Sequence, residues 1–420
     1  MKRWPLFLVP WSVTPDVRRV LTGRAIRGFV DGFVSVLLAQ YLTGLGYSPT
    51  EVGAIVTGTL VGSALLTLAF GLTSHRFTLR TLLIAATGMM FLTGLGFATI
   101  TWFWPLLVVA VFGTLNPSAG DVSVFLPTEQ ALVAGHVDAP RRPWLFAFYN
   151  LAGIFAGAFG ALFSVLPEGL AHWRHWNVSD TQQASFLLYA AAGIAIFVIY
   201  RGLHRDTDVF PTVSRAARRR ALHSSRRTVF ELAALFSLDS AGSGLVVTSL
   251  LVLWLHLRFD LSPATTAAVF FAAGLLGGCS QLLAPRLARR IGLIRTMAFT
   301  HIPANALLML AAFAPTGGLA IALLLVRALF AQMDVPARQA FVMAVVPADE
   351  RAAASSVTNV PRSLASAATP LLAGVLLAHS SFGWPLLIAG TVKISYDVLL
   401  LILYRHVPEE VGAARTRRGS

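Results

Sequence analysis

Charged residues are scarce in this chain, and their scarcity excludes an ordinary water-soluble fold. Only 12% of the 420 residues are Asp, Glu, Lys or Arg, whereas a soluble domain contains about 25%. Hydrophobic residues make up 56% of the chain, which is too many for polar side chains to cover in water. The chain therefore requires lipid as its solvent, and we expect an integral membrane protein.

Cysteine and the common catalytic motifs are also missing or nearly so. Cys279 is the single cysteine, which excludes an intrachain disulfide framework and a paired-cysteine metal site. The sequence contains no P-loop, which argues against ATP-driven pumping, and no recognisable nucleophile motif. We therefore expect a protein that is not an enzyme and that uses no cofactor and no resident metal ion.

Long apolar runs recur at the length that a membrane-spanning helix needs, about 20 residues. We predict an all-α membrane protein with twelve transmembrane helices in two six-helix bundles. Its expected parts are an N-terminal bundle (1–202), a basic cytoplasmic linker (203–228), a C-terminal bundle (229–405) and a cytoplasmic tail (406–420). The runs lie at roughly 20–45, 51–74, 82–100, 104–126, 144–166, 185–201, 229–256, 264–284, 296–314, 318–346, 352–379 and 384–404.

The positive charges predict an orientation. Arg and Lys gather before the first run, after the second, fourth and eighth runs, in the central linker and at the C-terminus. Such an excess marks the cytoplasmic side of a membrane protein. We therefore expect the chain to lie in the inner membrane of the cell. Both termini and the linker should lie on its cytoplasmic side. The net charge of +14 is assigned to this orientation and to contact with anionic lipid, and not to nucleic-acid binding.

The two halves of the sequence repeat each other. Asp31 and Asp239 each precede an apolar stretch that ends in Ser-Pro, at Pro49 and at Pro263. Farther along, LNPSAGDVSVFLPTE (115–129) occupies the same place in the first half as VPARQAFVMAVVPADE (335–350) in the second. Parallel halves of six spans, with a substrate site between them near the midplane, are one arrangement that transporters use.

The loop after the second run carries a family motif. It reads GLTSHRFTLR (71–80), and its counterpart in the second half reads PRLARRIG (285–292). Both resemble the loop signature of the major facilitator superfamily, and the resemblance extends over the whole chain. Four residues that match the signature are candidates for a role in gating: Gly71, Arg76, Arg80 and Arg290. His75 and Arg289 occupy the positions of an Asp that helps to lock the cytoplasmic side in the family, so we expect the lock to use other partners here.

The resemblance implies a secondary transporter, a permease that works by alternating access as two bundles rock about a central site. We expect proton-coupled efflux of a small solute by a monomer, with an uptake symporter or facilitator as the alternative. A transporter-like membrane sensor is a further alternative. Some members export trivalent arsenic or antimony, which prefer thiolate ligands. Cys279 is therefore a candidate metalloid ligand, although its first interpretation is that of a packing residue.

Charged side chains inside the apolar runs are functional candidates, because each costs about 2.5–3.5 kcal/mol at the bilayer centre. Residues four apart share a helix face. This spacing predicts three ion pairs: Arg27 with Asp31, Asp334 with Arg338, and Lys393 with Asp397. Each pair either braces the fold or takes part in gating.

Three carboxylates are the candidates for proton coupling: Asp239, Asp31 and Asp121. Asp239 and Asp121 have no basic residue one turn away on their own helices, and a lone carboxylate at low dielectric can exchange protons near neutral pH. For Asp239 the alternative is a salt bridge to Arg362 or Lys393 on another helix.

Polar side chains at membrane depth form the candidate substrate cavity. Arg362 follows Pro361 on the eleventh run, where it would attract an anionic solute or hold a carboxylate across the cavity. Each neutral candidate has the alternative role of a hydrogen bond between helices. The full set is Asn116, Tyr149, Asn150, Asn359, Arg362 and Lys393.

Overall fold

The regular structure is α-helical throughout the described part of the chain, which comprises residues 14–73, 77–118, 123–135, 142–204, 225–346 and 350–404 of a computed structural model. The predicted all-α fold is confirmed. The helices of the first half are α1 (Pro15–Gly44), α2 (Pro49–Thr73), α3 (Leu79–Thr99), α4 (Phe103–Phe112), α5 (Phe125–Gly135), α6 (Arg142–Phe163), α7 (Leu166–Arg174) and α8 (Val178–Arg201). Those of the second half are α10 (Arg226–Leu245), α11 (Thr248–Phe259), α12 (Pro263–Ile291), α13 (Leu293–Ala312), α14 (Gly317–Ala331), α15 (Asp334–Val345), α16 (Arg351–Ala368), α17 (Pro370–His379) and α18 (Trp384–Tyr404).

Most of the predicted spans are present as membrane-length helices. Within the described residues, 10 helical segments are long and apolar enough to cross a membrane, and the bent pair α10–α11 raises the number to 11. The remaining predicted span, 104–126, corresponds to the shorter apolar helix α4 and the start of α5. The twelve-span prediction therefore agrees with the fold to within this interrupted helix.

The repeated Ser-Pro pairs mark helix starts in both halves. Ser48 and Glu51 form a capping box at the start of α2, in which the Ser48 amide donates to the Glu51 carboxylate over 2.8 Å and the Glu51 amide donates to Ser48 Oγ over 3.3 Å. At the start of α12, Ser262 Oγ accepts from the Thr265 amide over 3.2 Å. Proline suits the first helical position because its missing N–H has no partner there.

Several predicted spans are broken into two helices, which periodicity alone does not indicate. α10 ends at Leu245 and α11 begins at Thr248, at an angle of 41°. The run 318–346 divides into α14 and α15, and the run 352–379 divides into α16 and α17. α17 begins at Pro370, which cannot donate the hydrogen bond that would continue α16.

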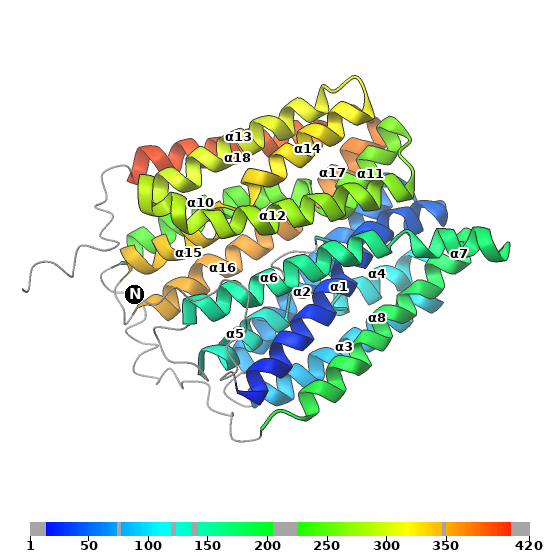
Figure 1. The fold of residues 1–420 in the computed structure, drawn as a ribbon, viewed down its shortest axis with the longest axis horizontal. Helices are drawn as coiled ribbons and strands as arrows, with labels where there is room; N and C mark the ends of the chain where they lie inside the picture. Colours follow the sequence, from blue (N-terminus) through cyan, green and yellow to red (C-terminus); the bar gives the residue numbers. More distant parts are fainter. Residues whose placement is uncertain are drawn as a thin grey trace, which may run out of the picture.

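The helices form two groups that lie side by side, α1–α8 and α10–α18 (Figure 1). The groups touch through α2 against α16 and α17, α6 against α12, and α1 against α11. Small residues allow the α6–α12 contact. A Cβ atom on Gly274 would lie 2.7 Å from Ala158 Cβ, and one on Gly278 would lie 2.8 Å from the Phe155 ring.

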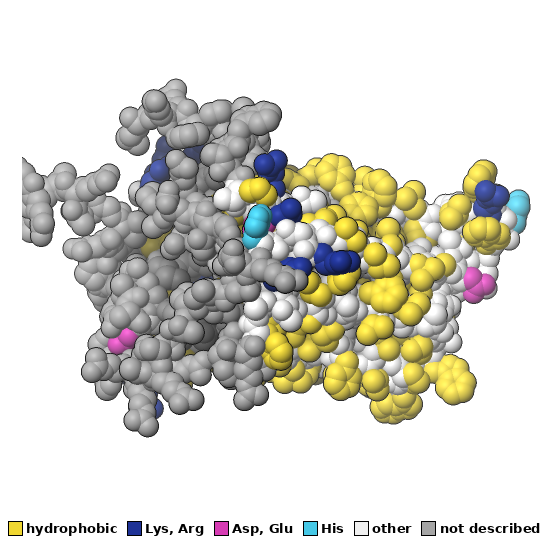
Figure 2. Space-filling model, turned by 90° about the horizontal axis from the view of Figure 1, so that it is seen from below, with side chains coloured by type: hydrophobic (Ala, Val, Ile, Leu, Met, Phe, Trp, Pro, Cys, Tyr) yellow, Lys and Arg dark blue, Asp and Glu magenta, His cyan; other side chains and the backbone are white. Residues whose placement is uncertain are grey.

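Apolar side chains cover the outside of the bundles. Figure 2 shows hydrophobic side chains spread over the described surface of the face that carries α3 and α8 in Figure 1, with Lys and Arg beside the grey atoms and again at the opposite end. On these helices Leu92 and Val198 are each 63% exposed. Such a surface suits lipid between two membrane boundaries.

Candidate functional site

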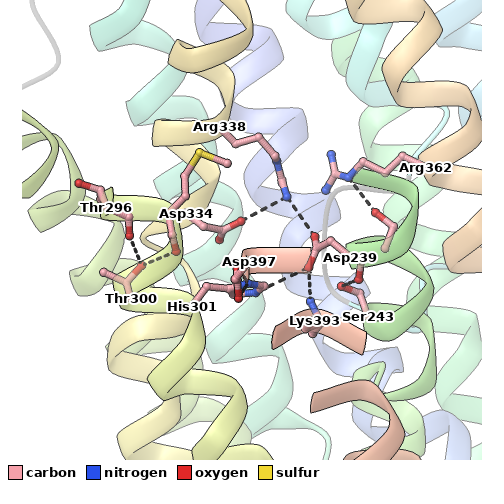
Figure 3. A network of polar contacts seen from close by, with 12 residues as sticks. Asp239, Ser243, Thr296, Thr300, His301, Asp334, Arg338, Arg362, Lys393 and Asp397 are labelled. Atoms are coloured by element: carbon pink, nitrogen blue, oxygen red, sulfur yellow. Dashed lines mark hydrogen bonds and ion pairs between the residues drawn. The ribbon is translucent and has the colours of Figure 1, made fainter. Parts of the chain in front are cut away.

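A cluster of charged side chains is buried inside the second half, and we call it the C-half charge network. It consists of Asp239, His301, Asp334, Arg338, Lys393 and Asp397, which come from α10, α13, α15 and α18 and point toward one another (Figure 3). None of the six residues is more than 5% exposed. Charges removed from water in this way persist only where they are paired.

Asp239 on α10 is the centre of this network. Lys393 Nζ donates to its Oδ1 over 2.7 Å, and Arg338 Nη1 donates to its Oδ2 over 3.2 Å. His301 Nε2 lies 3.7 Å from Oδ1. The helix leaves room for these partners, since a Cβ atom on Gly242 would lie 2.8 Å from Lys393 Cγ.

Two further carboxylates complete the network. Arg338 Nη1 also donates to Asp334 Oδ2 over 3.2 Å, which confirms the pair predicted from helical spacing. His301 Nδ1 lies 2.9 Å and 3.0 Å from the two carboxylate oxygens of Asp397. Asp397 is fully enclosed, with no exposed surface.

The predicted pair of Lys393 with Asp397 does not form. Lys393 binds Asp239 and Asp397 binds His301, so each partner lies on a different helix. The alternative proposed for Asp239, a salt bridge to Lys393, is the one that the structure contains. Arg362 instead donates from Nε to Ser240 Oγ over 2.9 Å and is partly exposed. Spacing along α18 could not reveal partners supplied by α10 and α13.

A second buried cluster lies in the first half, around Glu129 on α5. Arg27 on α1 binds both carboxylate oxygens of Glu129 through its two terminal nitrogens. The hydroxyls of Tyr149 on α6 and Tyr200 on α8 also donate to this carboxylate, Tyr200 over 2.6 Å. The Arg24 guanidinium lies 5.2 Å from the centre of the Tyr149 ring. Four helices therefore converge on one carboxylate.

The predicted pair of Arg27 with Asp31 is wrong, because Arg27 binds Glu129. Asp31 is 3% exposed, and its Oδ1 atom has no hydrogen-bond partner among the described residues. Sequence analysis did not select Glu129, although the repeat pointed to an acidic residue there: Glu129 lies two residues after Pro127, and Asp349 and Glu350 lie two and three residues after Pro347. Glu350 also acts as a tether, since it accepts from Ser225 at the start of α10.

The remaining candidates are scattered. Asn116 Oδ1 accepts from the Ser118 amide over 3.1 Å and shapes the segment after α4. Arg80 on α3 donates to the Arg201 carbonyl of α8 over 2.9 Å. Gly71 lies near the end of α2 and Arg290 near the end of α12, Asn150 is partly buried on α6, and Asn359 is exposed on α16. Asp121 and Arg76 lie outside the described residues.

Cys279 has an exposed side chain on α12. Within the part of the chain that the structure describes, no three His, Cys, Asp or Glu side chains group closely enough to hold a metal ion. The metalloid hypothesis therefore keeps Cys279 as its only support.

Hydrogen bonds join the two halves at the end of the molecule where α1 ends and α2 begins, which we call the α1–α2 end. Ser249 Oγ on α11 donates to the Ser35 carbonyl over 2.7 Å, and the Ser249 amide donates to the Pro117 carbonyl over 3.2 Å. The Leu371 amide of α17 donates to Thr57 Oγ1 of α2 over 2.8 Å. This end is therefore closed, and the charge pattern predicts that it is the outer end.

Comparison with known proteins gives a consistent assignment. The family model described as Major Facilitator Superfamily matches residues 20–330. An uncharacterised membrane protein of Saccharomyces cerevisiae is 23% identical in an alignment of length 429 that covers 94% of this chain and 95% of the relative. A D-xylose-proton symporter matches 94% of this chain and 98% of its own, with a TM-score of 0.73 and 15% identity. The nucleoside transporter NupG matches 93% of this chain and 99% of its own, with a TM-score of 0.67 and 12% identity.

Proposed function

Because this chain belongs to the major facilitator superfamily, a family of multi-pass membrane transporters, we propose that it moves a small solute across the membrane by proton-coupled alternating access. The observation that carries the proton coupling is the C-half charge network. A buried group of carboxylates and bases is costly unless every charge is paired, so a change in protonation alters which helices it holds together.

The position of the network supports a mechanical role. Asp239 lies on α10, and Ser249, which holds the first half, lies on α11. These two helices are the parts of one span that bends by 41° between them. A change in the ion pairs of Asp239 can therefore be passed through this bend to the contact between the halves.

The solute site is proposed to lie between the halves, with Asn116, Asn150, Asn359 and Arg362 as its polar candidates. Tyr149 and Lys393 are less available to a solute, because both are engaged in buried charge clusters. A small solute with polar groups fits this set of side chains.

Efflux is the proposed direction, and uptake is the second candidate. The D-xylose-proton symporter, similar in fold, favours uptake with protons. Vesicles of opposite orientation separate the two, since a proton-driven exporter accumulates solute in everted vesicles and a proton symporter accumulates it in right-side-out vesicles.

The coupling proposal is tested with the purified protein in liposomes. A solute found by screening is followed with and without a pH gradient. Asp239→Asn should abolish accumulation driven by the gradient while solute exchange continues, because exchange needs no net proton movement. Asp260→Asn is the matched control, since the Asp260 side chain is 97% exposed at the end of α11. Gradient-driven accumulation that persists in Asp239→Asn would remove Asp239 from coupling.

A further inference from the structure

We propose that the coupling proton is bound by His301, held between Asp239 and Asp397 inside the second half and away from the contact between the halves. This inference rests on the proposed proton-coupled function and assigns its ion site. It shifts the proton from Asp239, the carboxylate that sequence favours, to an imidazole on α13.

The charges of the network require one proton. It contains three carboxylates, Asp239, Asp334 and Asp397, and two basic side chains that are ion-paired with them, Arg338 and Lys393. With a neutral His301, the enclosed group carries one excess negative charge in a region of low dielectric, which is strongly unfavourable. One proton on His301 makes the network neutral.

The ring geometry selects His301 as the group that takes this proton. Nδ1 is within 3.0 Å of both oxygens of Asp397, and Nε2 faces Asp239 Oδ1 at 3.7 Å. A neutral imidazole has one N–H donor and one lone pair. If Nδ1 donates to Asp397, the lone pair of Nε2 faces a second carboxylate. Only the imidazolium offers a donor in both directions.

Several helices supply the surroundings of His301. Asn305 on α13 donates to the His301 carbonyl over 2.9 Å, and the Tyr396 ring of α18 lies edge-on to the imidazole at 6.1 Å. Arg362 on α16 is partly exposed, so water shares in solvating its charge. The charged and titratable groups around this site are Asp239 from α10, Asp334 and Arg338 from α15, Arg362 from α16, and Lys393, Tyr396 and Asp397 from α18.

The first half provides a contrast within the same molecule. Its buried carboxylate Glu129 pairs with Arg27, and both side chains are no more than 1% exposed. This pair is neutral without an added proton. The second half differs, because three carboxylates are joined in one network there.

Loss of the proton has a mechanical consequence. A neutral His301 can donate to Asp397 or to Asp239 but not to both, so either the link from α13 to α18 or the link from α13 to α10 weakens. We expect deprotonation to weaken the link from α13 to α10, because the contact of His301 with Asp239 is the longer one, at 3.7 Å against 2.9 Å.

Nitrogen NMR of protein labelled with ¹⁵N-histidine tests the assignment without transport. In the purified full-length protein in lipid nanodiscs, the spectrum at neutral pH should contain a doubly protonated imidazole signal that disappears in His301→Gln. The control is His256→Gln, whose side chain is 51% exposed on α11; this variant should keep the signal. A His301 resonance typical of a neutral ring at the pH where the gradient drives transport would overturn the inference.

Transport assays separate this inference from the proposed function. His301→Gln should lose at least about tenfold in gradient-driven accumulation and retain solute exchange, which also shows that the variant is folded. Asp397→Asn should give the same pattern, because it removes the carboxylate that orients the ring. Should the wild type fail to respond to any pH gradient, the proposed function itself is wrong. If the wild type responds to the pH gradient and His301→Gln keeps full gradient-driven transport, a group other than His301 binds the proton.

Discussion

Glu129 shows how much a single carboxylate can organise in this protein. It is completely buried and accepts hydrogen bonds from Arg27, Tyr149 and Tyr200, so it links α5 to α1, α6 and α8. A buried charge pair of this kind holds a specific arrangement of helices, because each partner is costly to leave alone in a medium of low dielectric.

Glu129→Gln should therefore destabilise the protein strongly. The substitution keeps the shape of the side chain and removes its charge, which leaves the Arg27 guanidinium buried without its counter-ion. Breaking a buried pair typically costs about 3–5 kcal/mol. We expect a markedly lower thermal unfolding midpoint in detergent, measured by intrinsic fluorescence. Glu168→Gln serves as the control, since the Glu168 side chain is 27% exposed and its His172 partner lies at 3.8 Å. Equal midpoints for the two variants would contradict this role for Glu129.

Of the three ion pairs that helical spacing predicts, one is confirmed and two are wrong. Asp334 and Arg338 are four residues apart on α15, and they do pair. Arg27 and Glu129 are 102 residues apart, and Lys393 and Asp239 are 154 apart. Periodicity carries no information on such partners, because they depend on how helices pack and not on the pattern within one helix.

At the scale of helices, glycine determines where the halves can meet. The backbones of α2 and α17 approach so closely that a Cβ atom on Gly374 would lie 2.9 Å from Gly53 Cα. The hydrogen bond from the Leu371 amide to Thr57 lies on the same pair of helices. This contact belongs to the closed α1–α2 end, and any larger side chain must push the helices apart.

Gly374→Val should open the α1–α2 end. The valine side chain cannot fit against Gly53 in the closed state, so the equilibrium shifts toward the state in which α2 and α17 separate. Spin labels at Thr50 and Ser381, on opposite halves at this end, should move to a longer distance when measured by pulsed electron paramagnetic resonance. In the control Gly88→Val on α3, the new Cβ atom meets no atom within 4 Å, and the label distance should remain that of the parent. An unchanged distance in Gly374→Val would show that the contact between Gly53 and Gly374 does not keep the α1–α2 end closed.

Helix breaks were the elements that sequence predicted least well. Apolar composition identifies a membrane span, and α10 and α11 together are long and apolar enough to form one. The 41° bend between them depends on tertiary packing. Pro370 gave a usable signal, since α17 begins there. The α10–α11 bend has no proline within either helix to announce it, and Gly242 and Gly244 are its nearest sequence indications.

For the whole molecule, composition and charge predicted the all-α fold, because both reflect the solvent that surrounds the protein. Low charge content and recurrent apolar runs of about 20 residues admit few alternatives to a helical bundle in lipid. The grouping of helices into halves followed from the repeat of Asp, Ser-Pro and helix proline. Sequence selects five of the six residues of the C-half charge network but not His301, because most of its contacts depend on how four separate helices pack.

The orientation of the chain in the membrane decides which state the structure represents. The halves are joined at the α1–α2 end, and in the orientation that the positive-inside pattern predicts this end would face the outside. We expect a cysteine at Ser214 in the linker to react with a membrane-impermeant maleimide only after cells are opened, and a cysteine at Asp180 in the first turn of α8 to react in intact cells. Cys279→Ser supplies the background without other thiols. Labelling of position 214 in intact cells would reverse the topology. The closed end would then face the cytoplasm, and the vesicle orientations that identify efflux and uptake would exchange.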